Sequence, residues 1–405
     1  MFFQPSEVAV NYEYQLMATW LGTYKIITMN KTLFTTAAIS SALLGASFAG
    51  SDADALDASL ISKEKSFFDR FTFGSYGEIH TSFTENGTDI DPHRIVLFAD
   101  FQFTDRLKFV SETELEHFLR KKPGGEFSSS GVELKLEQAY FEYAFNDGLV
   151  GRAGLVLTPV GIINEVHEPT TFYGVERPNV EKNIIPTTWT VLGAGVTKIY
   201  DSGWQFDGLF HGGNDTRGGS IRSGRSKYGI DLFGVNSDGN KFYQNNDSWA
   251  VTTRGKYTGI AGVELAGAVQ YQSDMDSTAT GSQSGVLGEA HGIYRNGGFQ
   301  FIALGTAWDI DVSNSEGDSQ WGYYLEPSYA WDTRIGKVGV FGRYSQYKYA
   351  NLEQGSTAKE NTDYSMGGNY WINEHLVVKA DYLNTASKGK VGSTESYNLG
   401  FGWSY

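Results

Sequence analysis

Large apolar residues alternate with small or polar residues along most of this chain, and the pattern is clearest at the C-terminus. Tyr397, Leu399, Phe401, Trp403 and Tyr405 occupy every second position, with asparagine, glycine or serine between them. A period of two is typical of a β-strand with one apolar face and one polar face. Such a strand either packs into the core of a soluble β-sandwich or faces lipid in a membrane barrel.

The same alternation predicts sixteen strands, separated by connections that are alternately short and long. The strands are expected to begin near residues 70, 93, 107, 132, 149, 191, 204, 248, 262, 285, 298, 321, 337, 362, 375 and 396. Long loops are expected near 84–92, 122–131, 163–190, 213–247, 276–284, 311–320, 350–361 and 387–395. Outer-membrane barrels have short periplasmic turns, long extracellular loops and an even number of strands. The sequence therefore predicts an all-β fold, a sixteen-stranded antiparallel transmembrane β-barrel over residues 70–405.

The N-terminal region has the pattern of an exported protein. Met29-Asn-Lys31 precedes an apolar stretch that ends in Ser47-Phe48-Ala49, which is typical of a secretory signal peptide. The alternative, a short amphipathic core helix, would need a polar face that this stretch lacks. We therefore expect residues 1–28 to lie upstream of the true start, 29–49 to be the signal peptide and 50–69 to be a periplasmic lead-in. The expected location is the outer membrane.

Composition narrows the possible chemistry. The 405 residues include no cysteine, which excludes disulfides, thiolate metal sites and cysteine nucleophiles. The net charge of −15 argues against nucleic acid as a partner, because phosphate backbones bind basic surfaces. No catalytic residue, metal or cofactor is expected, and the protein is not expected to be an enzyme.

Strand parity separates lipid-facing from lumen-facing positions. The residues predicted to line the pore are Glu78, His80, Arg94, Asp100, Glu112, Glu114, Glu116, Arg152, Arg343, Lys379 and Asp381. The three glutamates from 112 to 116 predict an acidic wall, and charges on opposite walls of a pore select solutes by charge. The alternative is that any water-filled barrel is lined by polar groups. The strand at 132–145 changes phase partway along, which predicts a β-bulge.

The longest proline-containing connection, at 163–190, is expected to be the third extracellular loop. Proline stiffens a loop, and a loop of this length is usually functional. Its charged candidates are Glu165, His167, Glu168, Glu176, Arg177, Glu181 and Lys182. We expect the loop to fold into the lumen and narrow it, and the alternative is a loop that caps the barrel from outside.

The run from Arg152 to Gly195, RAGLVLTPVGIINEVHEPTTFYGVERPNVEKNIIPTTWTVLGAG, resembles the phosphate-selective porin O and P superfamily. The runs FVSETELEH and QAYFEYAF support this resemblance, and the expected topology extends it over the whole mature chain. The resemblance implies trimers of sixteen-stranded subunits whose pores use arginine ladders and lysine clusters. This chain departs from that pattern, because its clearest ladder consists of Glu112, Glu114 and Glu116.

Other chemistry is less strongly indicated. Glu165, His167 and Glu168 have side chains that could ligate a divalent metal, although salt bridges within the loop are the favoured interpretation. His117 has no serine partner that would indicate an outer-membrane hydrolase. The fourth long loop carries the basic residues Arg217, Arg222, Arg225 and Lys227. They could bind lipopolysaccharide phosphates or attract anions to the mouth of the pore, although a solvated flexible loop is the favoured interpretation.

These observations favour a porin that passes small hydrophilic or charged solutes by passive diffusion. Its expected partners are outer-membrane lipid and lipopolysaccharide, the diffusing solutes or ions, and two further copies in a homotrimer. The alternative is an outer-membrane barrel enzyme, or a surface-binding barrel of adhesin type, with a blocked lumen.

Overall fold

The computed structural model describes residues 67–405 apart from 118, 123, 126, 129–132, 217, 225–247, 277–278, 280 and 314. The expected upstream segment 1–28, the signal peptide 29–49 and residues 50–66 of the lead-in lie outside the described residues. A short 3₁₀ helix, η3 (Phe67–Arg70), comes directly before the first strand. Among the described residues, no helix has the length and apolar character that would let it span a membrane.

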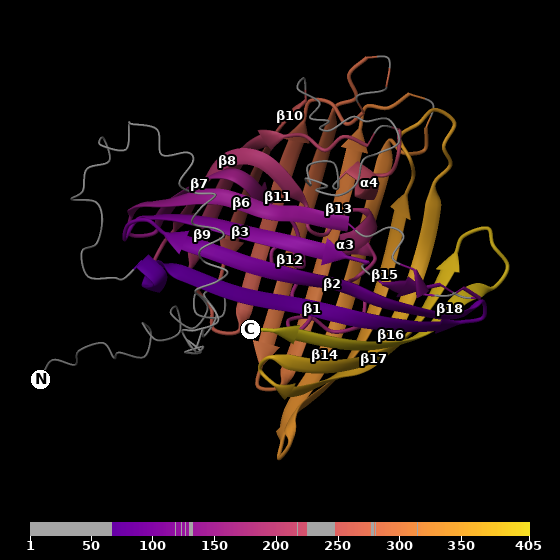
Figure 1. The fold of residues 1–405 in the computed structure, drawn as a ribbon. Coiled ribbons are helices and arrows are strands. Elements are labelled where there is room, and N and C mark those ends of the chain that lie inside the picture. The colour runs from indigo at the N-terminus through magenta and orange to yellow at the C-terminus, as the bar shows by residue number, and fades with distance from the viewer. Residues whose placement is uncertain are drawn as a thin grey trace, which may run out of the picture. The chain divides into compact units, whose positions relative to one another are not determined.

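The described chain forms one closed antiparallel sheet (Figure 1). Its long strands are β1 (Phe71–Thr84), β2 (Gly87–Gln102), β3 (Leu107–Glu116), β6 (Glu133–Asn146), β7 (Leu149–Leu157), β8 (Thr190–Ile199), β9 (Trp204–Gly212), β10 (Trp249–Tyr257), β11 (Val263–Gln272), β12 (Gly285–Asn296), β13 (Phe299–Ile310), β14 (Ser319–Thr333), β15 (Gly336–Tyr349), β16 (Lys359–Asn373), β17 (Leu376–Ser387) and β18 (Ser393–Ser404). Each pairs with its sequence neighbours, and β1 also pairs with β18, which closes the barrel. The predicted sixteen-stranded antiparallel barrel is confirmed.

The remaining elements lie in the connections between long strands. The two-residue strands β4 (Arg120–Lys121) and β5 (Phe127–Ser128) belong to the connection between β3 and β6. The short helices α3 (Val180–Asn183) and α4 (Ile221–Gly224) lie in the connections after β7 and after β9.

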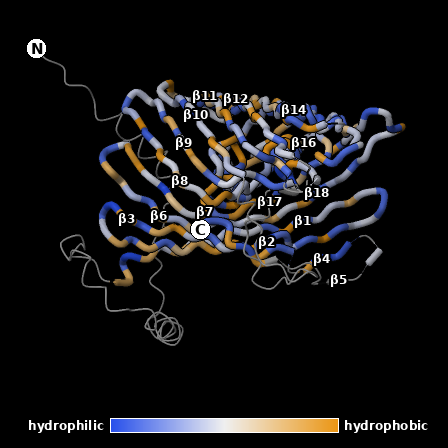
Figure 2. The backbone as a smooth tube through the Cα atoms, turned by 90° about the horizontal axis from the view of Figure 1, so that it is seen from above, coloured by the Kyte–Doolittle hydropathy of each residue, from blue (hydrophilic) through white to orange (hydrophobic). Residues whose placement is uncertain are grey.

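Apolar and polar residues alternate along the strands (Figure 2), and the apolar side chains are the exposed ones, as the alternation predicts. In β18, Tyr397 is 60% exposed and Leu399 50% exposed, whereas Asn398 between them is 5% exposed. Similar exposed side chains occur around the barrel, including Phe73, Leu97, Phe141, Val196, Phe210, Val269, Val340 and Met366. A continuous apolar outer face of this kind is suited to lipid.

The expected long loop at 84–92 is wrong. Strands β1 and β2 stay paired as far as Thr84 and Gly87, so that only Glu85 and Asn86 form the turn. The side chains of this segment are mostly polar on both faces. The alternation of apolar and polar residues is therefore absent from this part of the strands and could not predict them. A strand that continues beyond the apolar belt no longer needs an apolar face.

In the described part of the chain, four strand pairs have a register shift, and two of these shifts are β-bulges that lie away from the turns and change the inward-facing positions. One lies in β2, where Glu78 pairs with Arg94 and Ile79 with Pro92, which leaves His93 as the extra residue. The second lies in β6, where consecutive residues of β3 pair with Gln138 and Leu136. Glu137 is therefore the extra residue of β6, which confirms the bulge predicted within 132–145.

Candidate functional site: the loop between β7 and β8

The loop 158–189 lies inside the barrel, because its side chains and backbone contact strands far apart around the sheet. Glu165 forms an ion pair with Arg254 of β10. On β17, the ammonium group of Lys379 donates a hydrogen bond of 2.9 Å to the carbonyl of Gly174. A segment that reaches the inner faces of both strands crosses the interior.

Basic and amide side chains of the wall hold the loop by its backbone. Arg94 donates to the carbonyl of His167 at 2.9 Å, and Arg343 donates to that of Tyr173 at 2.8 Å. The same kind of contact is made by Asn369 to Phe172 and by Lys379 to Gly174. In return, the carboxylate of Asp381 accepts from the backbone N–H of Val175. Three of the predicted pore-lining bases, Arg94, Arg343 and Lys379, therefore anchor the loop.

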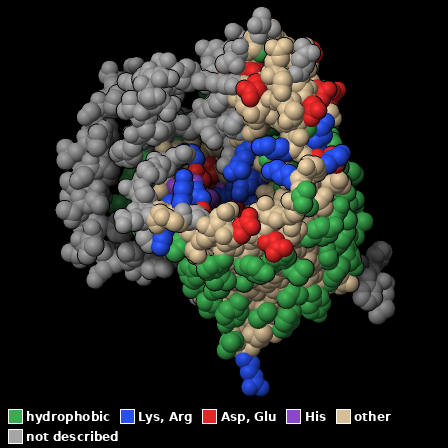
Figure 3. Space-filling view, turned by 90° about the vertical axis from the view of Figure 1, so that its right-hand side faces the viewer, with side chains coloured by type: hydrophobic (Ala, Val, Ile, Leu, Met, Phe, Trp, Pro, Cys, Tyr) green, Lys and Arg blue, Asp and Glu red, His purple; other side chains and the backbone are tan. Residues whose placement is uncertain are grey.

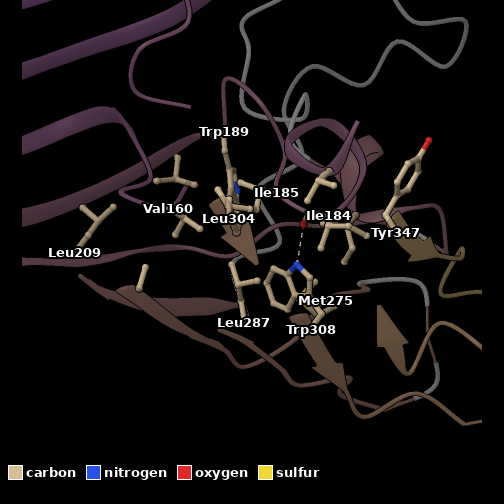
Figure 4. Packing of buried hydrophobic residues seen from close by; sticks show 14 of the residues in the cluster. Val160, Ile184, Ile185, Trp189, Leu209, Met275, Leu287, Leu304, Trp308 and Tyr347 are labelled. Atoms are coloured by element: carbon tan, nitrogen blue, oxygen red, sulfur yellow. Dashed lines mark hydrogen bonds between the residues drawn. The ribbon is translucent and has the colours of Figure 1, made fainter. Parts of the chain in front are cut away.

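The opposite face of the loop packs into an apolar cluster within the barrel (Figure 4). Its members from the loop include Val160, Val180, Ile184, Ile185 and Trp189, and its members from the wall include Leu287, Leu304, Trp308 and Tyr324. The indole N–H of Trp308 donates to the carbonyl of Ile184 at 3.0 Å. Buried apolar area of this kind stabilises one loop position, and the carbonyl is satisfied at the same time.

Glycines on the inner face of β18 leave space for the loop to lie against this strand. A Cβ atom at Gly402 would lie 2.5 Å from Cβ of Pro169, and one at Gly400 would lie 3.1 Å from the side chain of Val175. The small residues that alternate with aromatics in β18 are therefore required at these two positions, because the loop occupies the space that side chains would need.

The glutamate ladder lies on the inner face, but mostly under the loop. Glu112 is 1% exposed and Glu114 is 3% exposed. Glu114 lies 3.5 Å from the guanidinium of Arg94, which also pairs with Glu78 at 2.7 Å. Glu116 is half-buried and pairs with Lys135. Only the end of the ladder is therefore within reach of solvent.

The remaining predicted wall residues lie in smaller clusters. Arg152 donates to Glu142 at 2.8 Å, and Asp100 is half-buried near this pair. His80 lies between Glu78 and the loop residue Glu176, at 3.1 and 3.0 Å. The structure therefore brings His80 together with the loop, whereas Arg152 and Asp100 belong to a separate group.

The loop acids have unequal environments. Burial alone would raise the pKa of Glu176, but the ion pairs with Lys182, at 2.9 Å, and His80 hold its pKa well below the ordinary value. The buried carboxylate of Glu181 accepts hydrogen bonds from Tyr324 and from two loop N–H groups, and burial raises its pKa.

The last two predicted loop residues also have assigned positions. Arg177 donates to Thr188 at 3.0 Å, and one buried carboxylate oxygen of Glu168 has no hydrogen-bond partner among the described residues. Of the predicted basic group in the fourth long loop, Arg222 is exposed on α4, whereas Arg217, Arg225 and Lys227 lie outside the described residues.

The alternation of apolar and polar positions did not assign two residues to the inner face. Glu137 and His93 are the extra residues of the two bulges, and a strict period of two does not count an inserted residue. The phase change in VELKLEQAYFEYAF was the available signal for Glu137. His93 had no comparable signal, because its strand was expected to begin at that residue.

Comparisons with known proteins identify the fold of this chain but do not assign it to a family. No family model matches the chain. An uncharacterized protein of Aquifex aeolicus (strain VF5) is 45% identical over 131 residues, which are 31% of this chain and 28% of that protein. The chain therefore aligns with less than a third of that relative.

Solved outer-membrane proteins share the barrel. OmpF of Salmonella typhi, solved with daunomycin, has a TM-score of 0.55 at 13% identity, covering 83% of this chain and 97% of its own. Outer-membrane expressed OmpT of Vibrio cholerae has a TM-score of 0.53 at 11% identity, with 83% and 97% covered. OprB of Pseudomonas putida has a TM-score of 0.52 at 11% identity, with 83% and 94% covered. The chain has the fold of outer-membrane β-barrel proteins.

Proposed function

We propose that this protein is an outer-membrane porin through which small hydrophilic or charged solutes pass by diffusion, and that loop 158–189 narrows the passage. The apolar outer face suits lipid, and the charged inner face suits water. A long loop held within the barrel restricts the free cross-section without any need for catalysis.

The observation that carries this proposal is that charged inner side chains stay accessible at both ends of the barrel. Near the turn 147–148, the side chain of Arg152 is 32% exposed. At the opposite end, Arg120 is 35% exposed and Glu176 of the loop is 39% exposed. Figure 3 shows a hollow bordered by Lys and Arg side chains on one face of the molecule.

The accessible charges, rather than the buried ladder, are expected to determine which ions pass more easily. Glu112 and Glu114 are buried, whereas the side chains of Lys182, Arg120 and Glu176 are partly exposed. The accessible set has both signs, which favours broad passage of small polar solutes. Membership of the phosphate-selective porin O and P superfamily stays a prediction from the sequence.

The proposal includes assembly and location. OmpT of Vibrio cholerae, whose solved structures include a trimer form with a TM-score of 0.50 to this chain, offers a precedent for a homotrimer. Outer-membrane lipid would surround the apolar face, and lipopolysaccharide would meet the end that carries the long connections.

Liposome swelling tests the proposal directly. Liposomes that contain the folded protein should admit small sugars at rates that fall steeply with sugar size, and protein-free liposomes should admit none. If folded protein leaves the liposomes as tight as lipid alone, the porin is excluded. A barrel enzyme or a surface-binding barrel with a blocked lumen would then be favoured.

A further inference from the structure

Three buried side chains from separate parts of the chain converge beneath the loop. They are Glu112 of β3, Glu137 at the bulge of β6, and His167 of the loop, which are 1%, 4% and 3% exposed. His167 Nε2 lies 3.7 Å from Glu112 Oε1 and 3.8 Å from Glu137 Oε1. The three atoms all lie within 4.8 Å of one another.

All three converging atoms lack a hydrogen-bond partner anywhere in the described part of the chain. Buried polar atoms are nearly always satisfied, so that each exception requires an explanation. A direct hydrogen bond from a protonated imidazole would bring its nitrogen to about 2.7–2.9 Å from a carboxylate oxygen. The observed separations of 3.7 and 3.8 Å are too long for that bond.

The other polar atom of each side chain is held in place. His167 Nδ1 lies 3.0 Å from the carbonyl of Asn164, which can only accept, so that Nδ1 carries a proton and the neutral ring presents the lone pair of Nε2 to the two carboxylates. Glu112 Oε2 accepts from the amide of Gln138, and Glu137 Oε2 accepts from the Tyr76 hydroxyl. Outer contacts of this kind orient the ligands in metal sites.

We propose that Glu112, Glu137 and His167 form a binding site for a divalent transition-metal ion of the Zn²⁺ class, which fastens the loop to the barrel wall. Bonds of about 2.0–2.2 Å to three ligands in tetrahedral geometry place the ligand atoms roughly 3.4 Å apart. The two separations from His167 Nε2, 3.7 and 3.8 Å, need only a small contraction to fit. The site leaves a fourth position for water or another ligand.

The donor set determines the class of ion. Imidazole nitrogen suits Zn²⁺ and its neighbours, whereas Ca²⁺ takes six to eight oxygen ligands and Mg²⁺ keeps most of its waters. The bulge is essential to the site, because it turns Glu137 inward beside Gln138. The site differs from the metal-ligand set of Glu165, His167 and Glu168, which was the less favoured interpretation of the sequence, since Glu165 pairs with Arg254 instead.

The test uses the full-length folded protein in detergent, stripped with chelator and then titrated with Zn²⁺. Wild type should bind one equivalent of Zn²⁺. Glu137→Gln should bind Zn²⁺ more than about 10-fold more weakly, because loss of a residue that only hydrogen-bonds a metal ligand already weakens binding by about 10-fold or more. Glu114→Gln is the matched control, because Glu114 is also buried on this wall but contacts Arg94. It should bind like wild type. Failure of wild type to bind a stoichiometric ion, or unchanged binding in Glu137→Gln, would overturn the proposal.

X-ray absorption of the Zn²⁺-loaded wild type keeps the proposal testable if Glu137→Gln does not fold. The chain has no cysteine, and its seven histidines are all among the described residues. The proposed site requires one imidazole and oxygen ligands at about 2.0–2.2 Å. Two imidazoles would instead indicate Asp91, His93 and His117, the second cluster with ligand atoms close together, and would contradict the assignment.

Discussion

At the scale of single residues, Arg94 connects the barrel wall to the loop. Its guanidinium is 1% exposed, donates to Glu78 at 2.7 Å and to the carbonyl of His167 at 2.9 Å, and lies near Glu114. A buried ion pair is not in itself strong evidence of stability, because desolvation opposes it. Loss of one partner is different, because the charges left behind stay buried without compensation.

We therefore expect Arg94→Ala to lower the free energy of unfolding by about 3–5 kcal/mol. The exposed Arg106 provides a charge-matched control, and Arg106→Ala should change the free energy of unfolding by less than about 0.5 kcal/mol. Denaturant titrations of the folded protein in detergent would measure both. Equal effects of the two substitutions would contradict the role of Arg94 as a buried anchor.

Glu176 makes the loop sensitive to acid. Its pKa is held well below the ordinary value by Lys182 and His80, so that its charged form stabilises the fold. This contribution is present above the unfolded-state pKa of about 4.3 and is lost as the pH falls through the folded-state value. The thermal midpoint of wild type should therefore exceed that of Glu176→Gln most clearly near pH 5–7, with the difference shrinking below about pH 4.

The control for this titration is Glu374→Gln, because the side chain of Glu374 is 75% exposed. It should leave the midpoint nearly unchanged at each pH. A difference between wild type and Glu176→Gln that grows on acidification would show that the carboxylate does not stabilise the loop.

At the scale of elements, alternation was sufficient to predict the strands and the bulge within 132–145, but not the bulge in β2. The expected start at residue 149 agrees with β7, and that at 204 agrees with β9. Parity failed for Glu137 and His93, because each is the inserted residue of a bulge. The partners of the loop were also beyond prediction, since Arg343 and Lys379 approach it from strands that come far later in the chain.

The fit between the loop and β18 can be tested by adding one methyl group. Gly402→Ala would place Cβ 2.5 Å from Pro169, so that the loop or the strand must move. Overpacking of this kind costs about 1–3 kcal/mol. Gly342→Ala is the control, because a Cβ atom there meets nothing within 4 Å. The two variants should differ in denaturant midpoint, and equal midpoints would contradict close packing of the loop against β18.

At the scale of the whole barrel, the loop divides the interior into two different environments. One side is an apolar cluster around Trp308, and the other is a network of ion pairs around Arg94 and His80. The charged half agrees with the inner positions predicted from the sequence. The apolar half was not predicted, because inward-facing apolar residues such as Leu287 and Leu304 resemble lipid-facing ones until the position of the loop is known.

Single-channel recording in a planar bilayer tests the central claim, that the barrel conducts and that its internal loop limits the flow. Wild type should give discrete conductance steps, and a variant with residues 161–187 replaced by a short glycine-serine linker should give clearly larger ones. Equal steps in the two proteins would contradict the loop as the narrowest point. A flat baseline for wild type, with folded protein shown to be in the bilayer, would contradict the porin itself.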